Sequence, residues 1–255
     1  MSEENKSSIL NIDQMQTAGL HFGHNVSRLH PKMKPFVSGI KNNVHMIDLE
    51  KTVKEFETTL KFISKTISEG KTILFVGTKI QIKSFVKSTA EDCQMPYVTE
   101  RWLGGSFTNF ETISKRVQYF KDLESKKVSG GLEKYTKKER LDFDKEIESL
   151  KNKFEGIKNM KKLPDAVLIL DIKKDITCAH EAKRKGIKII GVVDTNVDPT
   201  ICDYIIPAND DAIKAISLLV KTIADAFEEG RRMWEKKAVS IAKKEAQEAK
   251  EKVKV

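Results

Sequence analysis

The sequence predicts an α/β protein with a doubly wound parallel sheet and an inserted helical hairpin. Apolar runs of strand length alternate with segments in which apolar residues recur every three or four positions. This alternation is typical of parallel strands joined by right-handed crossover helices. The run KTILFVGT, Lys71–Thr78, is apolar through its centre, as expected for a strand covered on both faces. Residues 106–162 break the alternation, because they contain no strand-like run.

The predicted elements follow one another with short connections. The run Val44–Leu49 precedes a helix predicted over Glu50–Ser68. The inward stripe of that helix consists of Val53, Phe56, Leu60 and Ile63. The later strands are predicted at Lys71–Thr78, Pro96–Glu100, Pro164–Asp171, Ile187–Thr195 and Asp203–Asp210. One helix is predicted over Ile80–Asp92. Another ends at Lys185, and the last ends at about Glu229. We expect Thr78 to cap the helix over Ile80–Asp92, and Asn209 or Asp210 the last one.

Two charge-rich helical patterns flank the sequence SGG at Ser129–Gly131. The first pattern contains Thr112, Arg116, Phe120 and Leu123, and the second Leu141, Ile147, Leu150 and Phe154. Their spacing predicts two antiparallel helices with a narrow apolar seam. The sequence therefore divides into a discontinuous sheet domain, residues 1–105 and 163–230, a helical hairpin insertion, residues 106–162, and a charged helical or disordered tail, residues 231–255.

The composition favours an anionic partner. The chain has 46 basic and 37 acidic residues, which gives a net charge of +9. Nucleic acid and a membrane surface both fit this balance. No apolar run reaches the roughly 20 residues that span a bilayer, and the opening MSEENKSSIL is typical of neither a secretory signal nor a transit peptide. Three cysteines without a CxxC pair indicate a reducing cytoplasm.

Motifs for small-molecule chemistry are missing from the sequence. A single glycine, Gly77, follows the strand ILFV, whereas a dinucleotide-binding loop needs three at fixed spacing. No phosphate-binding loop ends in Gly-Lys-Ser/Thr, and no serine lies in a nucleophile-elbow pattern. The sequence therefore predicts a protein that is not an enzyme and has no small-molecule substrate.

The stretch GLHFGHNVSRLHPKMKPFVSGIKNNVH, Gly19–His45, holds four of the five histidines and no Asp or Glu. It could form a metal or acid–base site, or a cationic loop for a polyanion. Because Pro31 and Pro35 fix φ, we expect the chain around them to be extended. An extended, acid-free, cationic segment suits a phosphate backbone, and RNA more than DNA. The cations of this segment are Arg28, Lys32, Lys34 and Lys41.

Two further motifs are informative. In RWLGGSFTNF, Arg101–Phe110, we expect Arg101 to contact nucleic acid and Trp102 to lie in the core. Thr108 or Asn109 would cap the first hairpin helix. The acidic clusters DTNVDP and NDDA each follow a predicted strand. They could bind a divalent ion together with histidines, although turn formation and helix capping account for them more simply.

Several of these motifs, in order, resemble the bacterial small-subunit ribosomal protein S2 family. They are GLHFGHNVSRLHPKMKPFVSGIKNNVHMIDLEKT, ILFVGTK, RWLGGSFTNF, LPDAVLILD and VVDTNVDP with DYIIPANDDAIKAISL, from about Met15 to Gly230. The resemblance implies a flavodoxin-like sheet with a coiled-coil hairpin and a structural role in translation. It also implies contact with small-subunit rRNA and neighbouring proteins, including docking of ribosomal protein S1. Ser106–Phe107 departs from the usual aliphatic pair, and the tail lies outside the family pattern.

The resemblance assigns rRNA contact to the basic loop. From charge and placement we add Lys79, Arg101, Lys115 and Arg116. The family requires no cofactor, but some members bind zinc, and by motif position such a site would involve His24, Asp194 and Asp211. We expect a cytoplasmic ribosome, with an organellar one as the open alternative, and no membrane partner. A flavodoxin-like enzyme and a coiled-coil adaptor are the competing interpretations.

Overall fold

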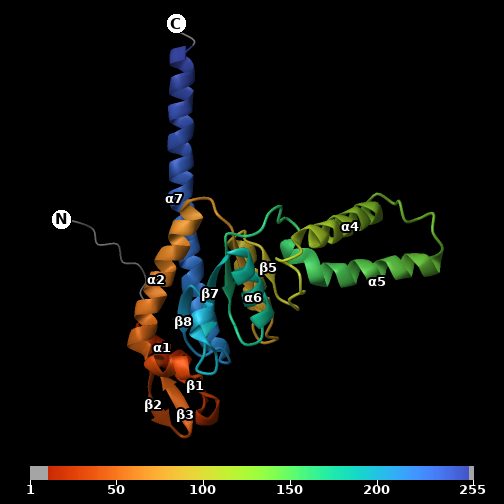
Figure 1. The fold of residues 1–255 in the computed structure, drawn as a ribbon. Coiled ribbons are helices and arrows are strands. Elements are labelled where there is room, and N and C mark those ends of the chain that lie inside the picture. The colour runs from red at the N-terminus through yellow and green to blue at the C-terminus, as the bar shows by residue number, and fades with distance from the viewer. Residues whose placement is uncertain (1–10, 253–255) are drawn as a thin grey trace.

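The structure is a computed structural model that describes the backbone of residues 11–252 and the side chains of residues 11–237. Its centre is a five-stranded parallel sheet of order β5-β4-β6-β7-β8 (Figure 1). The strands are β4 (Ile73–Val76), β5 (Tyr97–Val98), β6 (Ala166–Ile169), β7 (Lys188–Val193) and β8 (Tyr204–Pro207). All four neighbouring pairs are parallel. The predicted α/β class and its parallel sheet are confirmed.

The first predicted strand does not join this sheet. It forms β3 (Val44–Ile47), the middle strand of a separate antiparallel sheet with β1 (Phe22–Asn25) and β2 (Val37–Lys41). A two-residue turn joins β2 to β3, and both of its asparagines have positive φ, 50° at Asn42 and 61° at Asn43. Asparagine tolerates this left-handed region, so the hairpin closes locally. A strand at Val44–Leu49 followed by a helix is therefore confirmed, but the strand belongs to the separate antiparallel sheet and not to the parallel one.

One face of the parallel sheet is covered by α2 (Leu49–Ser68), α3 (Lys83–Asp92) and α7 (Ile213–Lys252). Their apolar side chains form one core with the strand residues Ile73, Phe75, Leu168, Ile190 and Val192. The short helix α1 (Ile12–Ala18) joins this layer through buried Met15. The predicted start of α2 is confirmed, because the Asp48 carboxylate accepts from the backbone N–H of Glu50. The predicted end of the last helix was wrong, since α7 continues to Lys252.

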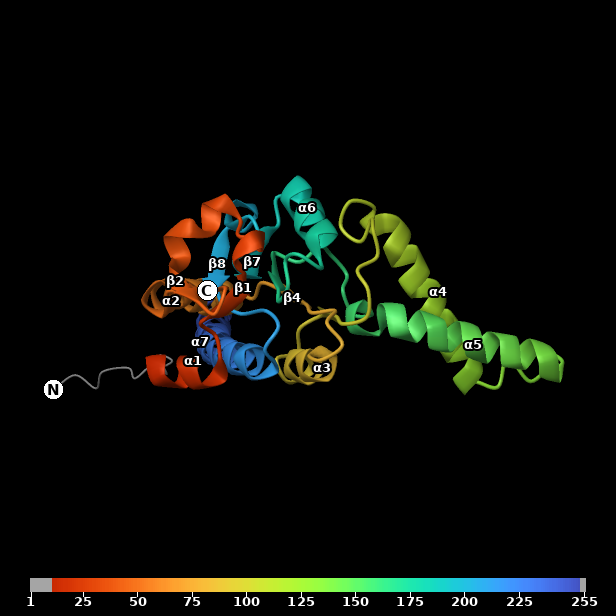
Figure 2. The ribbon, with the colours of Figure 1, turned by 90° about the horizontal axis from the view of Figure 1, so that it is seen from below.

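The other face is covered by α6 (Ile176–Lys185) and by the root of the hairpin. Side chains alternate along a strand, so the neighbouring positions of the same strands point this way. They are Leu74, Val76, Val167, Ile169 and Ile189. Trp102 packs there and is 7% exposed, which confirms that it belongs to the core. Figure 2 shows α6 on the opposite side of the sheet from α3 and α7.

Two helices, α4 (Phe110–Val128) and α5 (Lys137–Phe154), project from the sheet as a pair (Figures 1 and 2). Their buried residues are Val117, Phe120 and Leu123 on α4 and Ile147, Leu150 and Phe154 on α5. Thr136 and Glu139 cap the start of α5 reciprocally. Leu141 is 53% exposed, because a step of six residues from Ile147 turns about 120° around a helix. Its predicted place in the seam was wrong, as were those of exposed Thr112 and Arg116, which lie among the outward-facing residues of α4.

Two local predictions also failed. The segment around Pro31 and Pro35 is not extended but forms the 3-10 helix η2 (Pro31–Phe36), because the fixed φ of proline also suits a first helical turn. Thr78 does not cap α3, which begins at Lys83 without a side-chain cap. The remaining 3-10 helices are η1 (Val26–Arg28), η3 (Glu155–Ile157) and η4 (Pro199–Ile201). Among the described helices, none is both long and apolar enough to cross a membrane.

Candidate nucleic-acid interface and histidine–carboxylate cluster

The basic segment folds into short elements that turn its cations outward. Arg28 ends η1, Lys32 and Lys34 lie in η2, and Lys41 ends β2, and all four side chains are exposed. Met33, between the two lysines, is fully buried in the core on the α6 side of the sheet. This apolar anchor fixes η2, so that its neighbours in sequence point to solvent.

One of these cations has an intramolecular partner. Lys32 Nζ lies 2.8 Å from an oxygen of Asp198 and 2.9 Å from the hydroxyl of Thr200. The Lys32 ammonium, together with the hydroxyl and backbone N–H of Thr200, lowers the pKa of Asp198 below its usual range. The Lys32 side chain is still 53% exposed. An exposed pair of this kind is weak, so Lys32 can exchange the carboxylate for a phosphate.

The cations predicted near the hairpin are exposed but form a separate group. Arg101 follows β5, and Lys115 and Arg116 lie on the first half of α4. Lys115 pairs with Glu111 at 2.7 Å, and the Arg116 guanidinium lies 6.0 Å from the centre of the Tyr119 ring. Figure 2 shows α4 at one end of the molecule and β1 and β2 at the other, so these residues do not join the basic segment.

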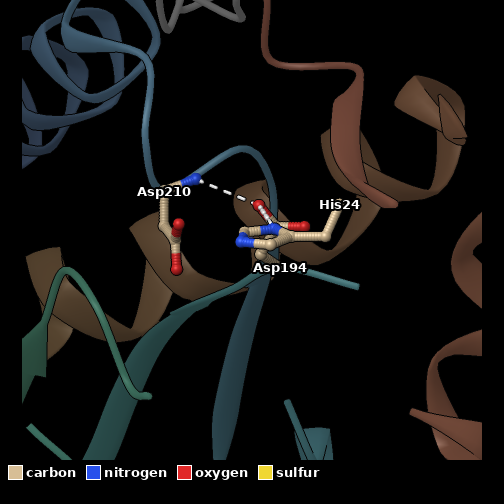
Figure 3. Close-up of side chains that lie close together, drawn as sticks. All are labelled: His24, Asp194 and Asp210. Atoms are coloured by element: carbon tan, nitrogen blue, oxygen red, sulfur yellow. Dashed lines mark hydrogen bonds and ion pairs between the residues drawn. The ribbon is translucent and has the colours of Figure 1, made fainter. Parts of the chain in front are cut away.

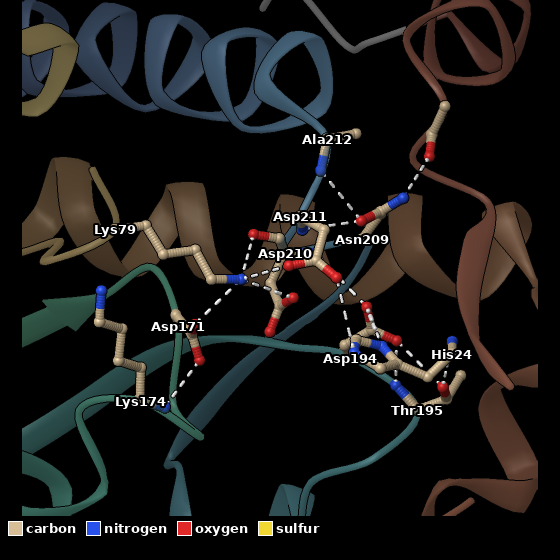
Figure 4. A network of polar contacts seen from close by, with 11 residues as sticks. His24, Lys79, Asp171, Lys174, Asp194, Thr195, Asn209, Asp210, Asp211 and Ala212 are labelled. Atoms are coloured by element: carbon tan, nitrogen blue, oxygen red, sulfur yellow. Dashed lines mark hydrogen bonds and ion pairs between the residues drawn. The ribbon is translucent and has the colours of Figure 1, made fainter. Parts of the chain in front are cut away.

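Lys79 is directed into the protein. Its ammonium lies 2.9 Å from carboxylate oxygens of Asp171, Asp210 and Asp211, and only 15% of its side chain is exposed (Figure 4). Burial lowers the pKa of Lys79, but the three carboxylates outweigh this effect and raise it. An ammonium with three internal partners has no reason to bind a phosphate, so we leave Lys79 out of the proposed interface.

His24, from β1, lies between two acidic residues. Its Nδ1 is 3.1 Å from an oxygen of buried Asp194, and its Nε2 is 3.6 Å from one of Asp211. The hydrogen bond to Asp194 raises the pKa of His24, and this outweighs the opposing effect of burial. Asp210 approaches the same point, and its ligand atom, with those of His24 and Asp194, fits within 4.8 Å (Figure 3).

Four carboxylates, those of Asp171, Asp194, Asp210 and Asp211, lie around one ammonium, Lys79, and one imidazole, His24. Burial raises the pKa of Asp210 to about 6, and the charges of Asp171 and Asp194 add to the effect. The Lys79 ammonium lowers the pKa of Asp211. One imidazole with carboxylate oxygens is a donor set that zinc accepts. The residues named from the resemblance thus lie side by side, and Asp210, which belongs to the NDDA cluster but not to that set, lies beside them.

A residue that sequence reasoning missed is Glu181, on α6, which is 5% exposed. Its oxygens accept hydrogen bonds from Trp102 Nε1 (3.2 Å), the backbone N–H groups of Gly105 (2.8 Å), Phe107 (3.0 Å) and Thr108 (3.1 Å), and the Thr108 hydroxyl (3.2 Å). Burial raises the pKa of Glu181, but these hydrogen bonds outweigh burial and lower it. The RWLGG turn is therefore built around a carboxylate. The sequence hinted at this only indirectly, because the backbone N–H groups of a tight turn need an acceptor from elsewhere in the chain.

The sequence is similar to known proteins over most of its length. The family model for ribosomal protein S2 matches residues 15–230. The small ribosomal subunit protein uS2 of Coprothermobacter proteolyticus is 43% identical over 224 residues, which cover 88% of this chain and 84% of that protein. The protein of the same name from Syntrophobacter fumaroxidans is 42% identical over 228 residues, covering 89% and 83%.

Proposed function

The chain belongs to the ribosomal protein S2 family, and from this premise we propose that it binds small-subunit rRNA through exposed cations on a rigid sheet domain. Membership of this family makes it a bacterial-type ribosomal protein with a structural role in translation, and not an enzyme. The proposal concerns what the chain contacts in the small subunit. Its partners there are rRNA and neighbouring proteins.

The observation that carries the proposal is the outward cationic segment anchored by Met33. No acidic residue lies between Asp13 and Asp48 to compensate Arg28 or Lys34. Phosphate groups of folded RNA supply that compensation, and each neutralised phosphate releases condensed counterions. Arg101, Lys115 and Arg116 form a second, separate contact at the root of the hairpin, where their side chains are exposed.

We assign different tasks to different parts of the chain. Residues 1–105 and 163–230 form the sheet domain that positions the rRNA contacts. Residues 106–162 form a coiled-coil hairpin for protein contacts, and residues 231–255 a charged tail. The buried seam of α4 and α5 is narrow and its outer faces are charged, which suits a rigid arm. Docking of ribosomal protein S1 is part of this proposal.

The proposal also includes zinc at His24, Asp194 and Asp211, with Asp210 beside them, although folding does not require it. A bound ion would replace the His24 proton and relieve repulsion among the carboxylates. Calorimetric titration of the purified chain with zinc tests this: we expect binding with proton release, lost in His24→Ala. Equal zinc binding by the wild type and His24→Ala would contradict the assignment.

Sedimentation tests the ribosomal contact. The tagged chain should migrate with small subunits in a sucrose gradient and leave them after a high-salt wash. Replacing Arg28, Lys32 and Lys34 together by glutamine should lower the slope of log affinity against log salt by roughly two to three, because each lost phosphate contact removes about 0.7 to 0.9.

The matched control replaces three exposed lysines of α2, Lys54, Lys61 and Lys65, by glutamine. It removes the same charge from another surface. Equal slopes for the two variants would contradict the assignment of the basic segment. Migration of the wild type as a free protein would contradict the proposed function as a whole. A hairpin deletion that keeps rRNA binding and abolishes a protein contact would support the division of tasks.

A further inference from the structure

We propose that the exposed face of α6, with the turn before it, is a second phosphate-binding surface for small-subunit rRNA. Together with the surface of η2, it forms one continuous surface for contact with rRNA. This inference rests on the proposed function and deepens it, because it identifies the side of the sheet domain that faces RNA.

In the segment 173–188 the basic side chains are exposed and the acidic side chains are buried. Its exposed charged residues are all cations, namely Lys173, Lys174, Lys183, Arg184, Lys185 and Lys188. Its two acidic residues are both buried, Asp175 at 4% exposure and Glu181 at 5%. The net charge of the segment does not show this separation, because it counts buried and exposed residues alike.

The buried acids form no ion pair with the outer cations, because their oxygens face donors inside the protein. Asp175 accepts from the Thr78 hydroxyl at 3.1 Å. Glu181 accepts all five hydrogen bonds from the RWLGG turn described above. The outward side of α6 is therefore uniformly positive.

Most of the outer cations have no acidic partner among the described residues. Lys188 is the exception, since it pairs with Asp203 at 2.7 Å. The side-chain ammonium groups of Lys174 and Lys183 donate to the backbone carbonyls of Thr78 and Thr200. Lys173, Arg184 and Lys185 make no hydrogen bond or ion pair with a described residue. Uncompensated charge of one sign attracts a polyanion of the other.

This face continues into the basic segment. Lys183 Nζ lies 3.4 Å from the Thr200 carbonyl oxygen, and Lys32 Nζ lies 2.9 Å from the hydroxyl of the same residue. η4, which contains Thr200, therefore joins α6 to η2. Figure 2 shows α6 and the red-orange segment after β1 on one side of the molecule, with α3 and α7 on the other.

The chemistry of the face favours RNA over a membrane surface. The exposed positions of α6 are Thr177, His180, Lys183, Arg184 and Lys185. An interfacial helix carries bulky apolar residues beside its cations, and none of these five residues is apolar. Lysine, arginine and polar side chains are the groups that contact phosphates and 2′-hydroxyls in folded RNA.

The test compares two variants of equal charge. One replaces Lys183, Arg184 and Lys185 by glutamine, and the other replaces Lys54, Lys61 and Lys65 of α2. The probe is a full-length bacterial small-subunit rRNA transcript, and affinity is measured across a series of KCl concentrations. We expect the α6 variant to lower the salt slope by roughly two to three. We expect the α2 variant to change it little, and thermal melting to show that both variants fold.

Each outcome decides between proposals. A lower slope for the α6 variant alone supports the inference. Equal slopes for both variants, with tight binding by the wild type, overturn it and leave the proposed function standing. No rRNA binding by the wild type, or binding to anionic vesicles instead, overturns both.

Labelling the native chain gives an independent measurement. In assembled small subunits treated with an amine-reactive reagent, we expect Lys183 and Lys185 to be protected and Lys61 and Lys65 to be modified. Modification of all four lysines to the same extent as in the free protein would overturn the inference.

Discussion

The two helical layers on the parallel sheet are held by different kinds of contact. On one face, α6 is tied to its surroundings by buried carboxylates, Asp175 to Thr78 and Glu181 to the RWLGG turn. On the other face, α2 and α7 pack through apolar side chains and a close approach at Gly230. Because the acidic side chains of the α6 segment are buried, the charged side chains that remain on its surface are cations. Where the packing is apolar, the exposed side keeps both signs, as Lys221, Asp225 and Glu228 show on α7.

The largest effect should come from removing the polar anchor of α6. Glu181→Ala removes the acceptor of five donors, of which Trp102 Nε1 and the Phe107 N–H are buried and cannot turn to water. We expect it to lower the free energy of unfolding by about 3–5 kcal/mol, since buried unsatisfied donors keep their full desolvation penalty. Urea denaturation followed by circular dichroism measures the change.

Two variants sharpen this test. Glu181→Gln keeps one oxygen acceptor but turns an amide towards donors, so its effect should be intermediate. Glu57→Ala on α2 removes a carboxylate that accepts no hydrogen bond from a described residue, and it should change the free energy by less than about 0.5 kcal/mol. Similar losses for Glu57→Ala and Glu181→Ala would refute the contrast between the layers.

The next effect depends on pH. Burial raises the pKa of Asp175 to about 6, from an ordinary value near 3.8. The folded state therefore holds this proton more tightly than the unfolded state, and the contribution of Asp175 to stability falls as pH rises from about 4 through 6. Asp175→Asn cannot ionise and its amide oxygen can still accept from Thr78. Relative to the wild type, it should gain up to about 3 kcal/mol in unfolding free energy between pH 4 and pH 8.

Unfolding of the wild type and Asp175→Asn at pH 4, 6 and 8 measures this difference. Because the other titrating groups are common to both proteins, their effects cancel in the comparison. A constant difference across the three pH values would mean that Asp175 is ionised throughout, and that the α6 layer tolerates a buried charge at no cost.

The smallest effect should come from the apolar layer. A Cβ at Gly230 would lie 2.7 Å from the Ser64 carbonyl oxygen and 2.8 Å from Ile67 Cβ, so Gly230→Ala must push α7 away from α2. We expect a loss of about 1–2 kcal/mol, because overpacking is partly offset by the higher helix propensity of alanine. Gly39→Ala, at an open position of β2, is the control for a harmless added methyl group. A stabilised Gly230→Ala would show that the two helices are not closely packed.

Local sequence patterns predicted the parts of the fold that local physics determines. The continuous apolar runs gave all five parallel strands, and the period of three to four gave α2, α4 and α5. The alternation did not reveal which sheet Val44–Leu49 joins, because that depends on an asparagine turn rather than on hydrophobicity. The end of α7 was also missed, since a charged helix beyond Gly230 buries little and carries no stop signal.

Sequence reasoning identified most residues of the candidate site, but not which of them point inward and which point to solvent. The resemblance named His24, Asp194 and Asp211, and in the structure the His24 ring lies beside both carboxylates; metal binding there stays a prediction. Lys79 was taken for a surface cation because charge alone does not show which way a side chain points. Asp175 and Glu181 were overlooked for the same reason: along the chain they sit between lysines, and only the fold turns them inward.

The ion pairs of Lys79 also bear on what kind of scaffold this is. In sheets of this strand order, small molecules enter a crevice where the connections diverge, here between the ends of β4 and β6. Lys79 follows β4, Asp171 follows β6, and their 2.9 Å pair spans that divergence. Side chains of the chain itself thus pair across the place that a nucleotide occupies in related architectures. The pair of Lys79 with Asp171 also ties two neighbouring strands together at their carboxyl ends.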